Sequence, residues 1–499
     1  MKIKSLCPEC LGVIDAEIEE KNNKIIIKKT CKEHGGFEDL YYGDAKIFNR
    51  FLKDKYDNSG LENPNTHKKK GCPYDCGLCN NHKSPTVLGI IDVTNRCNQK
   101  CPVCFANAEA CGYVYEPTIK QLKKMLHNLI NEKPVPCRAV MFSGGEPTMR
   151  KDLPYIIRMA KQMGFIKIFI ATNGINISKD PNYIAVLKEA GLDVVYLQFD
   201  GITEKPYHTI RGFNALPIKL KVIENCRKIN FNQVILVPTL IGGVNDKEVG
   251  EIVKFAVKNS DVVVTVNFQP LSFAGRVDEK DLKKMRITQS DLMHLLEEQL
   301  KGQIGPDDFY SVPSLIPLSL FFERLQNKQI TKFSCHPACG SATYIYIDDR
   351  KIIPITRFVD IDSFFNLIKQ INNDKEKNRY VWKIKAMSKI IKEIPKLVDK
   401  TKMPKSINMI KLAINFLKGD ENALAVFYEK SILIGAMHFM DGYNFDCQRV
   451  QRCVVHYSTL DDRIIPFCSY NAIHRTIVEK KFSKPLNIKS KNKEDRNFK

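Results

Sequence analysis

Three cysteines with short, regular spacing are the clearest chemical signal in this sequence. Cys97, Cys101 and Cys104 are separated first by three residues and then by two. Three thiolates at this spacing can hold three irons of a [4Fe-4S] cluster and leave the fourth iron open to a non-protein ligand. The triplet follows an apolar segment, residues 87–93, so we predict a catalytic cluster at the end of a strand. A structural cluster or a zinc knuckle is the alternative.

A second triplet, Cys72, Cys76 and Cys79, repeats the same spacing upstream. It follows a polar stretch, residues 54–70, which is typical of a linker rather than of a strand. This context predicts an auxiliary [4Fe-4S] site, with a zinc knuckle as the alternative. Its fourth ligand is not evident from the sequence.

The chain begins with a third set of metal-binding side chains, namely Cys7, Cys10, Cys31 and His34. These residues bracket an alternating apolar stretch that predicts a β-hairpin. A unit this small needs a metal to fold, so we predict a mononuclear site with zinc as the default and iron if the site relays electrons. Alternatively, His34 caps the turn and a distant cysteine completes the site.

Four cysteines in the last third of the chain lie beside turn residues, namely Cys335, Cys339, Cys453 and Cys468. Together they would supply the four thiolates of a third cluster. Two unrelated buried pairs are the alternative interpretation. Cys447 is a spare candidate ligand.

Short polar motifs follow the next predicted strands. They comprise Gly144, Gly145, Glu146 and Pro147, then Thr172 and Asn173, then Asp200, and finally Arg211. In this order, each at a strand end, the motifs resemble those of the radical S-adenosylmethionine (SAM) superfamily. The resemblance implies that backbone carbonyls of the Gly-Gly-Glu-Pro segment contact the SAM amino group, while the later motifs line the SAM site. Arg211 could pair with the SAM carboxylate by a bidentate fork, or could be an ordinary surface arginine.

The motifs must be positioned by a repeating pattern of strands and helices. Buried parallel strands are predicted at residues 87–93, 139–142, 167–171, 194–199, 234–238 and 262–268. Amphipathic helices are predicted at residues 119–131, 153–163, 183–189, 217–228 and 247–258. About six such units indicate an α/β fold, and the resemblance favours a partial (βα)6 barrel over an open sheet. In both arrangements the site lies at the carboxyl ends of the strands.

The pattern divides the chain into five regions. They are a metal-binding ribbon (1–45), a linker with the auxiliary motif (46–84), the radical SAM core (85–275), a C-terminal α+β substrate and auxiliary-cluster domain (276–480) and a flexible tail (481–499). Within the C-terminal domain, residues 369–430 predict Lys-rich amphipathic helices interrupted by Pro395 and Pro404.

Composition limits the partners of the protein. The net charge of +21 favours an anionic partner such as nucleic acid, a phosphorylated molecule or acidic lipid. The first residues resemble no secretory signal, and no apolar run is long enough to span a membrane. We therefore expect a cytoplasmic protein, or one that is peripheral to the inner face of a membrane.

The ribbon, the tandem triplets and the segments around Cys453 and Cys468 are together similar to the archaeal tetraether lipid synthase family, whose members were earlier described as methylases of 7,8-dihydro-6-hydroxymethylpterin. This resemblance implies that a 5′-deoxyadenosyl radical removes hydrogen from the terminal methyl of a phytanyl chain, and that two such carbons are joined. It implies SAM, [4Fe-4S] clusters, a low-potential electron donor and an anionic archaeal ether phospholipid substrate. Helices in residues 383–416 could wall the lipid channel, or form an ordinary amphipathic domain with a solvated basic face.

Three other functions compete with this one. A radical SAM methyltransferase acting on 7,8-dihydro-6-hydroxymethylpterin, or an RNA-modifying radical SAM enzyme, would keep the same core. The sequence contains one Trp and no recognisable RNA-binding motif, so no nucleic acid partner is expected. An electron carrier would explain the cysteines but would leave the motifs after the second and third predicted strands without a purpose.

Overall fold

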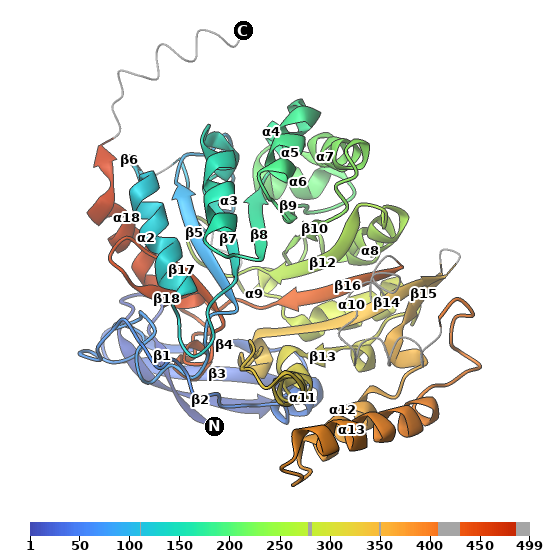
Figure 1. Cartoon of the computed structure of the whole chain (residues 1–499). Helices are drawn as coiled ribbons and strands as arrows, with labels where there is room; N and C mark the ends of the chain where they lie inside the picture. Colours follow the sequence, from blue (N-terminus) through green and yellow to red (C-terminus); the bar gives the residue numbers. More distant parts are fainter. Residues whose placement is uncertain (110, 278–281, 349–350, 408–429, 486–499) are drawn as a thin grey trace.

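A computed structural model describes residues 1–109, 111–277, 282–348, 351–407 and 430–485 of the chain (Figure 1). All six segments predicted as parallel strands are strands of one central sheet, namely β5 (Leu88–Thr94), β7 (Ala139–Gly144), β8 (Lys167–Thr172), β9 (Val194–Gln198), β10 (Val234–Val237) and β12 (Val263–Pro270). Each of these strands pairs in parallel with the next in this order. The predicted α/β class with a partial barrel is confirmed.

The region predicted as a C-terminal domain contributes strands to both edges of this sheet. β16 (Ser431–Met437) pairs in parallel with β12, and β17 (Val455–Ser458) pairs in parallel with β5. Antiparallel strands continue the sheet, namely β13 (Tyr310–Ser311), β14 (Gly340–Asp348), β15 (Lys351–Pro354) and β18 (Ile464–Pro466). Edge strands of an open barrel have unpaired backbone groups, and strands from residues 431–466 satisfy them. A boundary at residue 275 therefore does not separate two sheets.

Helices cover the outer face of the parallel strands (Figure 1). All five predicted helices form, namely α2 (Ile119–Ile130), α3 (Leu153–Gln162), α5 (Pro181–Glu189), α7 (Leu216–Lys228) and α8 (Val249–Lys258). Two short helices that were not predicted, α4 (Ile175–Lys179) and α6 (Glu204–Arg211), follow β8 and β9. Alternate strand residues point to opposite faces, so Ile91 and Val140 pack in the core with the helices while Ile90 and Met141 line a cavity on the inner face.

The N-terminal unit is a four-stranded antiparallel sheet rather than the predicted hairpin alone. Its strands are β1 (Lys2–Leu6), β2 (Val13–Lys21), β3 (Lys24–Cys31) and β4 (Gly35–Tyr42), followed by helix α1 (Ala45–Leu52). Asn22 and Asn23 both have positive φ, which is the geometry of a tight hairpin turn between β2 and β3. The alternating pattern predicted the hairpin, but it could not indicate the two outer strands.

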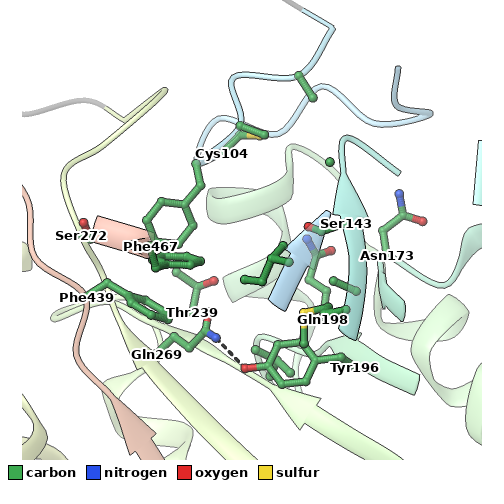
Figure 2. A pocket seen from close by; sticks show the side chains of 18 of the residues that line it. Cys104, Ser143, Asn173, Tyr196, Gln198, Thr239, Gln269, Ser272, Phe439 and Phe467 are labelled. Carbon is green, nitrogen blue, oxygen red and sulfur yellow. Dashed lines mark hydrogen bonds between the residues drawn. The ribbon is translucent and has the colours of Figure 1, made fainter. Parts of the chain in front are cut away.

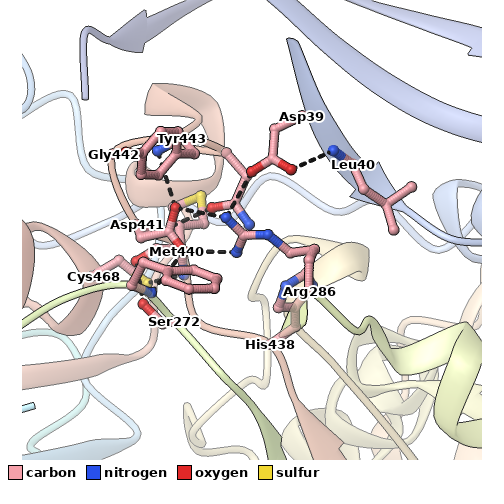
Figure 3. A network of polar contacts seen from close by, with 12 residues as sticks. Asp39, Leu40, Ser272, Arg286, His438, Met440, Asp441, Gly442, Tyr443 and Cys468 are labelled. Carbon is pink, nitrogen blue, oxygen red and sulfur yellow. Dashed lines mark hydrogen bonds and ion pairs between the residues drawn. The ribbon is translucent and has the colours of Figure 1, made fainter. Parts of the chain in front are cut away.

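Buried ion pairs attach this unit to the rest of the chain (Figure 3). The guanidinium of Arg286 lies 2.6 Å from Asp39 of β4 and 2.7 Å from Asp441, which follows β16. All three side chains are buried. Removing Arg286 would break both buried ion pairs and leave Lys29 as the remaining cation near Asp39 and Asp441, at a cost of about 3–5 kcal/mol.

The remaining helices lie mostly beyond residue 281. They are α9 (Leu282–Met285), α10 (Gln289–Gln299), α11 (Ile316–Gln326), α12 (Ile361–Asn372), α13 (Arg379–Glu393), α16 (Cys447–Val450), α17 (Phe467–Ser469) and α18 (Arg475–Phe482). The short strands β6 (Tyr113–Val114), β11 (Thr239–Leu240) and β19 (Lys484–Pro485) complete the set. Within the described ranges, no helix combines the length and apolarity that crossing a bilayer requires.

Two predictions about the C-terminal region fall partly outside the described residues. Of the Lys-rich helices predicted at 369–430, α12 and α13 are described, and a 3-10 turn at Ile394–Lys396 contains the predicted break at Pro395. Residues 408–429 lie outside the described ranges, as does part of the proposed 383–416 channel wall. The predicted tail from 481 is ordered at its start, because α18 runs to Phe482 and β19 pairs with β6. Residues 486–499 are outside the description.

Candidate active site and metal centres

The loop that follows β5 carries Cys97, Cys101 and Cys104 to the rim of a single cavity at the carboxyl ends of the parallel strands (Figure 2). Burial, with smaller contributions from the carboxylate of Glu146 and from the two other thiols, raises the pKa of Cys97 to about 12. Burial and Cys104 also raise the pKa of Cys101, against the opposing effect of Arg211. The three thiols are therefore close enough to interact, as ligands of one cluster must be. We call residues 97–104 the cluster loop.

Side chains from three later elements hold the cluster loop in place. The backbone of Arg276, beyond β12, exchanges two 2.9 Å hydrogen bonds with the backbone of Cys104, and its Nε donates to the carbonyl of Cys101 at 2.8 Å. Asn173 Nδ2 donates to Asn98 Oδ1 at 2.7 Å. Sequence analysis did not find Arg276, whose only signal is its position after the last predicted strand.

The two glycines of the Gly-Gly-Glu-Pro segment allow β7 to end directly against the start of the cluster loop. A Cβ on Gly144, where φ is +126°, would lie 2.0 Å from the carbonyl oxygen of Thr94. A Cβ on Gly145 would lie 2.3 Å from the carbonyl oxygen of Arg96. Any side chain at either position would therefore push the segment away from the cavity.

Glu146 and Pro147 do not line the cavity, and they stabilise the Gly-Gly-Glu-Pro segment through contacts on its other side. The buried carboxylate of Glu146 accepts hydrogen bonds from Thr172 Oγ1 and from the backbone N–H of Asn173, both at 2.7 Å. It also accepts from the backbone N–H of Thr148 at 3.1 Å. Burial raises the pKa of Glu146. Its role is to join the ends of β7 and β8, and Pro147 begins the 3-10 turn Pro147–Met149 between them.

Arg211 is buried, so the alternative of an ordinary surface arginine is wrong. Its Nε and Nη2 bond the two carboxylate oxygens of Asp200, both at 2.7 Å. Asp200 thus supplies the counter-charge that a buried guanidinium requires, while Arg211 also lines the cavity. Nη1 also donates to the carbonyl of Val103 at 3.3 Å, which anchors the cluster loop to α6.

Two further residues at this site were missed by sequence analysis. Lys219 of α7 is fully buried, and its Nζ donates to the carbonyl of Asn173 at 2.5 Å and to Gln198 Oε1 at 3.2 Å. Burial lowers the pKa of Lys219 to about 8. Gln99 lines the cavity within the cluster loop, and its buried Nε2 has no hydrogen-bond partner among the described residues. The sequence did not mark Lys219 as a site residue, because a lysine on a predicted amphipathic helix is expected on its solvent-exposed face.

The cavity has an apolar wall opposite the motifs (Figure 2). Its apolar lining includes Leu88, Ile90, Phe105, Met141, Phe169, Met437, Phe439, Val455, Tyr457 and Phe467. Phe439 and Phe467 are stacked with ring centroids 3.9 Å apart. No aspartate or glutamate is among the lining residues that the structure describes. Sequence analysis could not find the aromatic pair, because both rings come from residues beyond 430 that tertiary pairing brings to the barrel.

A small polar group also faces this cavity. Asn267 Nδ2 and Gln269 Nε2, both on β12, donate to the hydroxyl of Tyr196 on β9 at 2.7 Å. Figure 2 shows the bond from Gln269. The Tyr196 hydroxyl therefore already accepts two bonds and keeps its own proton for a further partner.

The ribbon brings together the four side chains predicted there. The ligand atoms of Cys7, Cys10, Cys31 and His34 all lie within 4.8 Å of one another. His34 Nδ1 lies 3.5 Å from Cys31 Sγ and 3.7 Å from Cys7 Sγ, so His34 faces the thiols. The hydrogen bond with His34, with help from nearby backbone N–H groups, lowers the pKa of Cys31 to about 6. A thiolate at neutral pH and a three-sulfur, one-nitrogen donor set fit tetrahedral zinc or iron.

The Cys72, Cys76 and Cys79 triplet gains a fourth neighbour in the structure. Cys447, on α16, approaches Cys72, with its Sγ 4.0 Å from the Cys72 carbonyl oxygen. A hydrogen bond with the Cys72 thiol, followed by burial, raises the pKa of Cys447. Cys447 therefore fits the fourth ligand position that the sequence left open, at a different site from the one for which it was the spare candidate.

The last four cysteines also assemble, and we call Cys335, Cys339, Cys453 and Cys468 the C-terminal quartet. The pKa of Cys335 is raised by burial and, to a smaller extent, by Cys339 and Cys453. The pKa of Cys453 is raised by burial and, to a smaller extent, by Cys468 and Cys339. One member of the quartet, Cys468, is adjacent in sequence to Phe467 of the aromatic wall. Cys468 also interacts with Cys339, so each of the four thiols has a neighbour in the other sequence pair, which favours one group over two unrelated pairs.

Arg449 provides a test of whether a cluster fits this quartet. Its side chain is buried, and its guanidinium interacts with the thiols of Cys339 and Cys468. Nη2 donates to the carbonyl of His438 at 2.7 Å, but Nε and Nη1 have no hydrogen-bond partner among the described residues. A buried cation with unused donors is costly unless an anion lies against it. The buried carboxylate of Asp446 offsets part of the charge, and the sulfides and thiolates of an anionic [4Fe-4S] cluster would accept from the unused donors.

Comparison with known proteins agrees with this geometry. The family model of the radical SAM superfamily matches residues 91–256, and that of the HMPTM N-terminal zinc ribbon domain matches residues 1–43. A protein of Methanocaldococcus jannaschii, named 7,8-dihydro-6-hydroxymethylpterin dimethyltransferase, is 53% identical over 490 residues, covering 97% of this chain and 96% of its own. The chain belongs to the radical SAM superfamily. Within that superfamily, it belongs to the same family as the M. jannaschii protein.

More distant proteins match parts of the chain. GTP 3′,8-cyclase of Clostridium acetobutylicum is 28% identical over 210 residues, which cover 41% of this chain and 64% of its own. The crystal structure of Streptococcus suis SuiB is 19% identical, with a TM-score of 0.36 over 44% of this chain and 47% of its own. Membership of the radical SAM superfamily implies SAM and a [4Fe-4S] cluster as cofactors, for which the cluster loop offers three thiolates.

Proposed function

We propose that this radical SAM enzyme joins the terminal methyl carbons of phytanyl chains in archaeal diether lipids to form tetraether lipids. The observation that supports this proposal best is the apolar wall beside the cluster loop. An alkyl terminus offers no hydrogen bonds, so only close apolar contact can hold it at the reacting position. Phe439, Phe467 and Met141 supply such contact within the cavity that Cys97, Cys101 and Cys104 line.

A [4Fe-4S] cluster with SAM would supply the radical chemistry that breaking an inert methyl C–H bond requires. The cluster loop would hold this cluster through its three cysteines. The ends of β7 and β8, joined by Glu146, would position SAM. In the overall balance, two methyl groups lose one hydrogen atom each and one carbon–carbon bond forms. Two SAM molecules and two electrons from a low-potential donor are consumed, which gives two 5′-deoxyadenosines and two methionines.

We further propose auxiliary [4Fe-4S] clusters at Cys72, Cys76, Cys79 and Cys447 and at the C-terminal quartet, with mononuclear zinc or iron in the ribbon. The grouping of each ligand set and the unused donors of Arg449 support these assignments.

Methylation of 7,8-dihydro-6-hydroxymethylpterin is the second candidate function. The name of the 53% identical M. jannaschii relative favours it. The polar group of Tyr196, Asn267 and Gln269 could bind the heteroatoms of a pterin ring. This function would require a transferable methyl group, which the coupling of two alkyl chains does not.

One experiment separates the two functions. The purified holoenzyme and a low-potential reductant are given methyl-labelled SAM together with archaeal diether phospholipid carrying deuterium in its terminal methyl groups, or with the pterin. For lipid coupling we expect deuterium in 5′-deoxyadenosine, about two deoxyadenosines per new bond and no label transferred. Methyl label in the pterin, with the lipid unchanged, would overturn the lipid proposal.

A further inference from the structure

Helix α13 has two apolar faces, and only one of them is buried. Trp382, Ala386 and Ile390 pack inward into a small core shared with α11 and α12. The opposite face carries large apolar side chains in contact with solvent, namely Tyr380 (77% exposed), Ile384 (69%) and Ile391 (46%). At 3.6 residues per turn these three positions fall within about 40° of one another, so they form a continuous stripe. Exposed apolar residues are usually scattered singly, which this stripe is not.

Lysines border the exposed stripe. The sequence of α13, RYVWKIKAMSKIIKE, contains five basic residues and a single acidic one. By helical position, Lys383 lies on one side of the stripe and Lys392 on the other. Lys385, on the same side as Lys392, is paired with Glu376 at 2.8 Å and is not counted among the flanking lysines. The helix is therefore buried on one side and presents apolar side chains between cations on the other. Figure 1 places α12 and α13 at one edge of the molecule, away from the helices of the barrel.

We propose that this outer face of α13, defined by Tyr380, Ile384 and Ile391 with their flanking lysines, docks on an anionic membrane surface. The apolar stripe would enter the boundary between head groups and acyl chains while the lysines contact lipid phosphates. Each lysine near an anionic surface contributes about 1 kcal/mol, or roughly fivefold in affinity. A second copy of the chain is a poorer occupant, because it would bring the same lysines against these.

The inference rests on the proposed lipid substrate, since an enzyme that acts on a bilayer lipid must first reach the bilayer. It extends that proposal by assigning the contact to one helix face remote in sequence from the cluster loop. The stripe is also separate from the apolar wall of the cavity, because no residue of α13 lines it.

The test is sedimentation of the full-length holoenzyme with vesicles of phosphatidylglycerol and phosphatidylcholine, compared with pure phosphatidylcholine. We expect binding to the anionic vesicles that weakens with salt, and at least a tenfold loss of affinity in the Ile384→Glu/Ile391→Glu variant. The matched control, Ile166→Glu/Ile477→Glu, makes the same change at positions that are 66% and 60% exposed elsewhere. This control should bind like the wild type. Lys383→Gln/Lys392→Gln should lose at least tenfold and reduce the salt dependence.

Equal binding by the α13 variant and its control would overturn the inference. An equal loss of vesicle affinity in both variants would also overturn it. So would light scattering that shows the α13 variant losing dimers while it still binds vesicles. Conversion of detergent-dispersed diether lipid is measured in parallel, because it needs no bilayer. If the wild type fails there, the proposed function is wrong. If only vesicle binding behaves contrary to expectation, the docking surface alone is wrong.

Discussion

The cluster loop and the C-terminal quartet are both groups of cysteines, but they are assembled differently. The cluster loop has three thiols within residues 97–104, on one loop that lines a cavity. The quartet has four thiols drawn from residues 335–468, and none of them lines that cavity. Three ligands leave one iron open to SAM, whereas four ligands close a cluster to substrates. Three ligands would suit a site for SAM chemistry, whereas four would suit a site for electron transfer or for structure.

The charged side chains around the two groups of cysteines also differ. Around the cluster loop, charges are paired within the protein, as Arg211 is with Asp200. Beside the quartet, Arg449 is buried with two nitrogens unpaired among the described residues. Arg211 is paired with a carboxylate, whereas Arg449 keeps donor nitrogens from which an anionic cluster would accept hydrogen bonds.

The largest expected effect on activity comes from removing one cysteine of the cluster loop. Replacing Cys101 with Ala should reduce 5′-deoxyadenosine formation at least a thousandfold, because the iron that binds SAM is lost with the cluster. Chromatographic quantification of 5′-deoxyadenosine under anaerobic reducing conditions measures the effect. Cys226→Ala, at a buried thiol far from any ligand group in sequence, is the control. Normal yield from the Cys101 variant would refute the assignment.

The next test removes a ligand from a four-thiol site. Cys447→Ala should lower the iron content by up to about four per chain while retaining SAM cleavage, because the cluster loop is untouched. Iron and sulfide analysis with parallel deoxyadenosine measurement would show this separation. Unchanged iron would mean that Cys447 is not a ligand of the Cys72 triplet.

The buried carboxyl of Glu132 tests whether solvent reaches the interior near β17. Glu132 is 3% exposed and accepts a 3.0 Å hydrogen bond from the backbone N–H of Thr86, whose hydroxyl contacts His456. Burial raises the pKa of Glu132 to about 7. A raised carboxyl pKa favours the folded state below the unfolded value of about 4.5, and this stability, up to about 3 kcal/mol, is lost as the pH rises through about 7.

Glu132→Gln should therefore flatten the pH dependence. Between pH 5 and pH 8.5 the melting temperature of the wild type should fall relative to that of the variant, as followed by circular dichroism under anaerobic conditions. Glu19→Gln, at an exposed carboxyl on the ribbon, serves as the control. Parallel curves for wild type and Glu132→Gln would mean that water reaches this carboxyl.

The smallest effect concerns the charge beside the quartet. Arg449→Gln should lower the reduction potential of the quartet cluster, because a positive charge that favours the reduced, more negative state is removed. We expect about a tenfold shift in the equilibrium, or about 59 mV for a one-electron couple. A redox titration followed by electron paramagnetic resonance measures it, with Cys335→Ala identifying the signal. Arg449→Lys should retain most of the potential, and an unchanged Arg449→Gln potential would refute the role.

Much of the core was predictable because its signals are local. Six strands and five helices formed where their apolar periodicity predicted, and the motifs after β7 and β8 lie at the strand ends. Arg211 shows the limit of such reasoning. Its position near the site was correctly anticipated, but its partner Asp200 could not be chosen over a SAM carboxylate, because pairing depends on which anion is buried beside it.

The sequence by itself determined the cluster loop, the ribbon ligands and the parallel core, since each depends on residues close together in the chain. Only the tertiary structure decided that β16 and β17 complete the sheet, that Cys447 joins Cys72, and that Phe439 and Phe467 wall the cavity. These contacts join residues hundreds of positions apart, and no local spacing encodes them. They form because edge strands need partners and apolar rings need burial, and the folded backbone determines which ones meet.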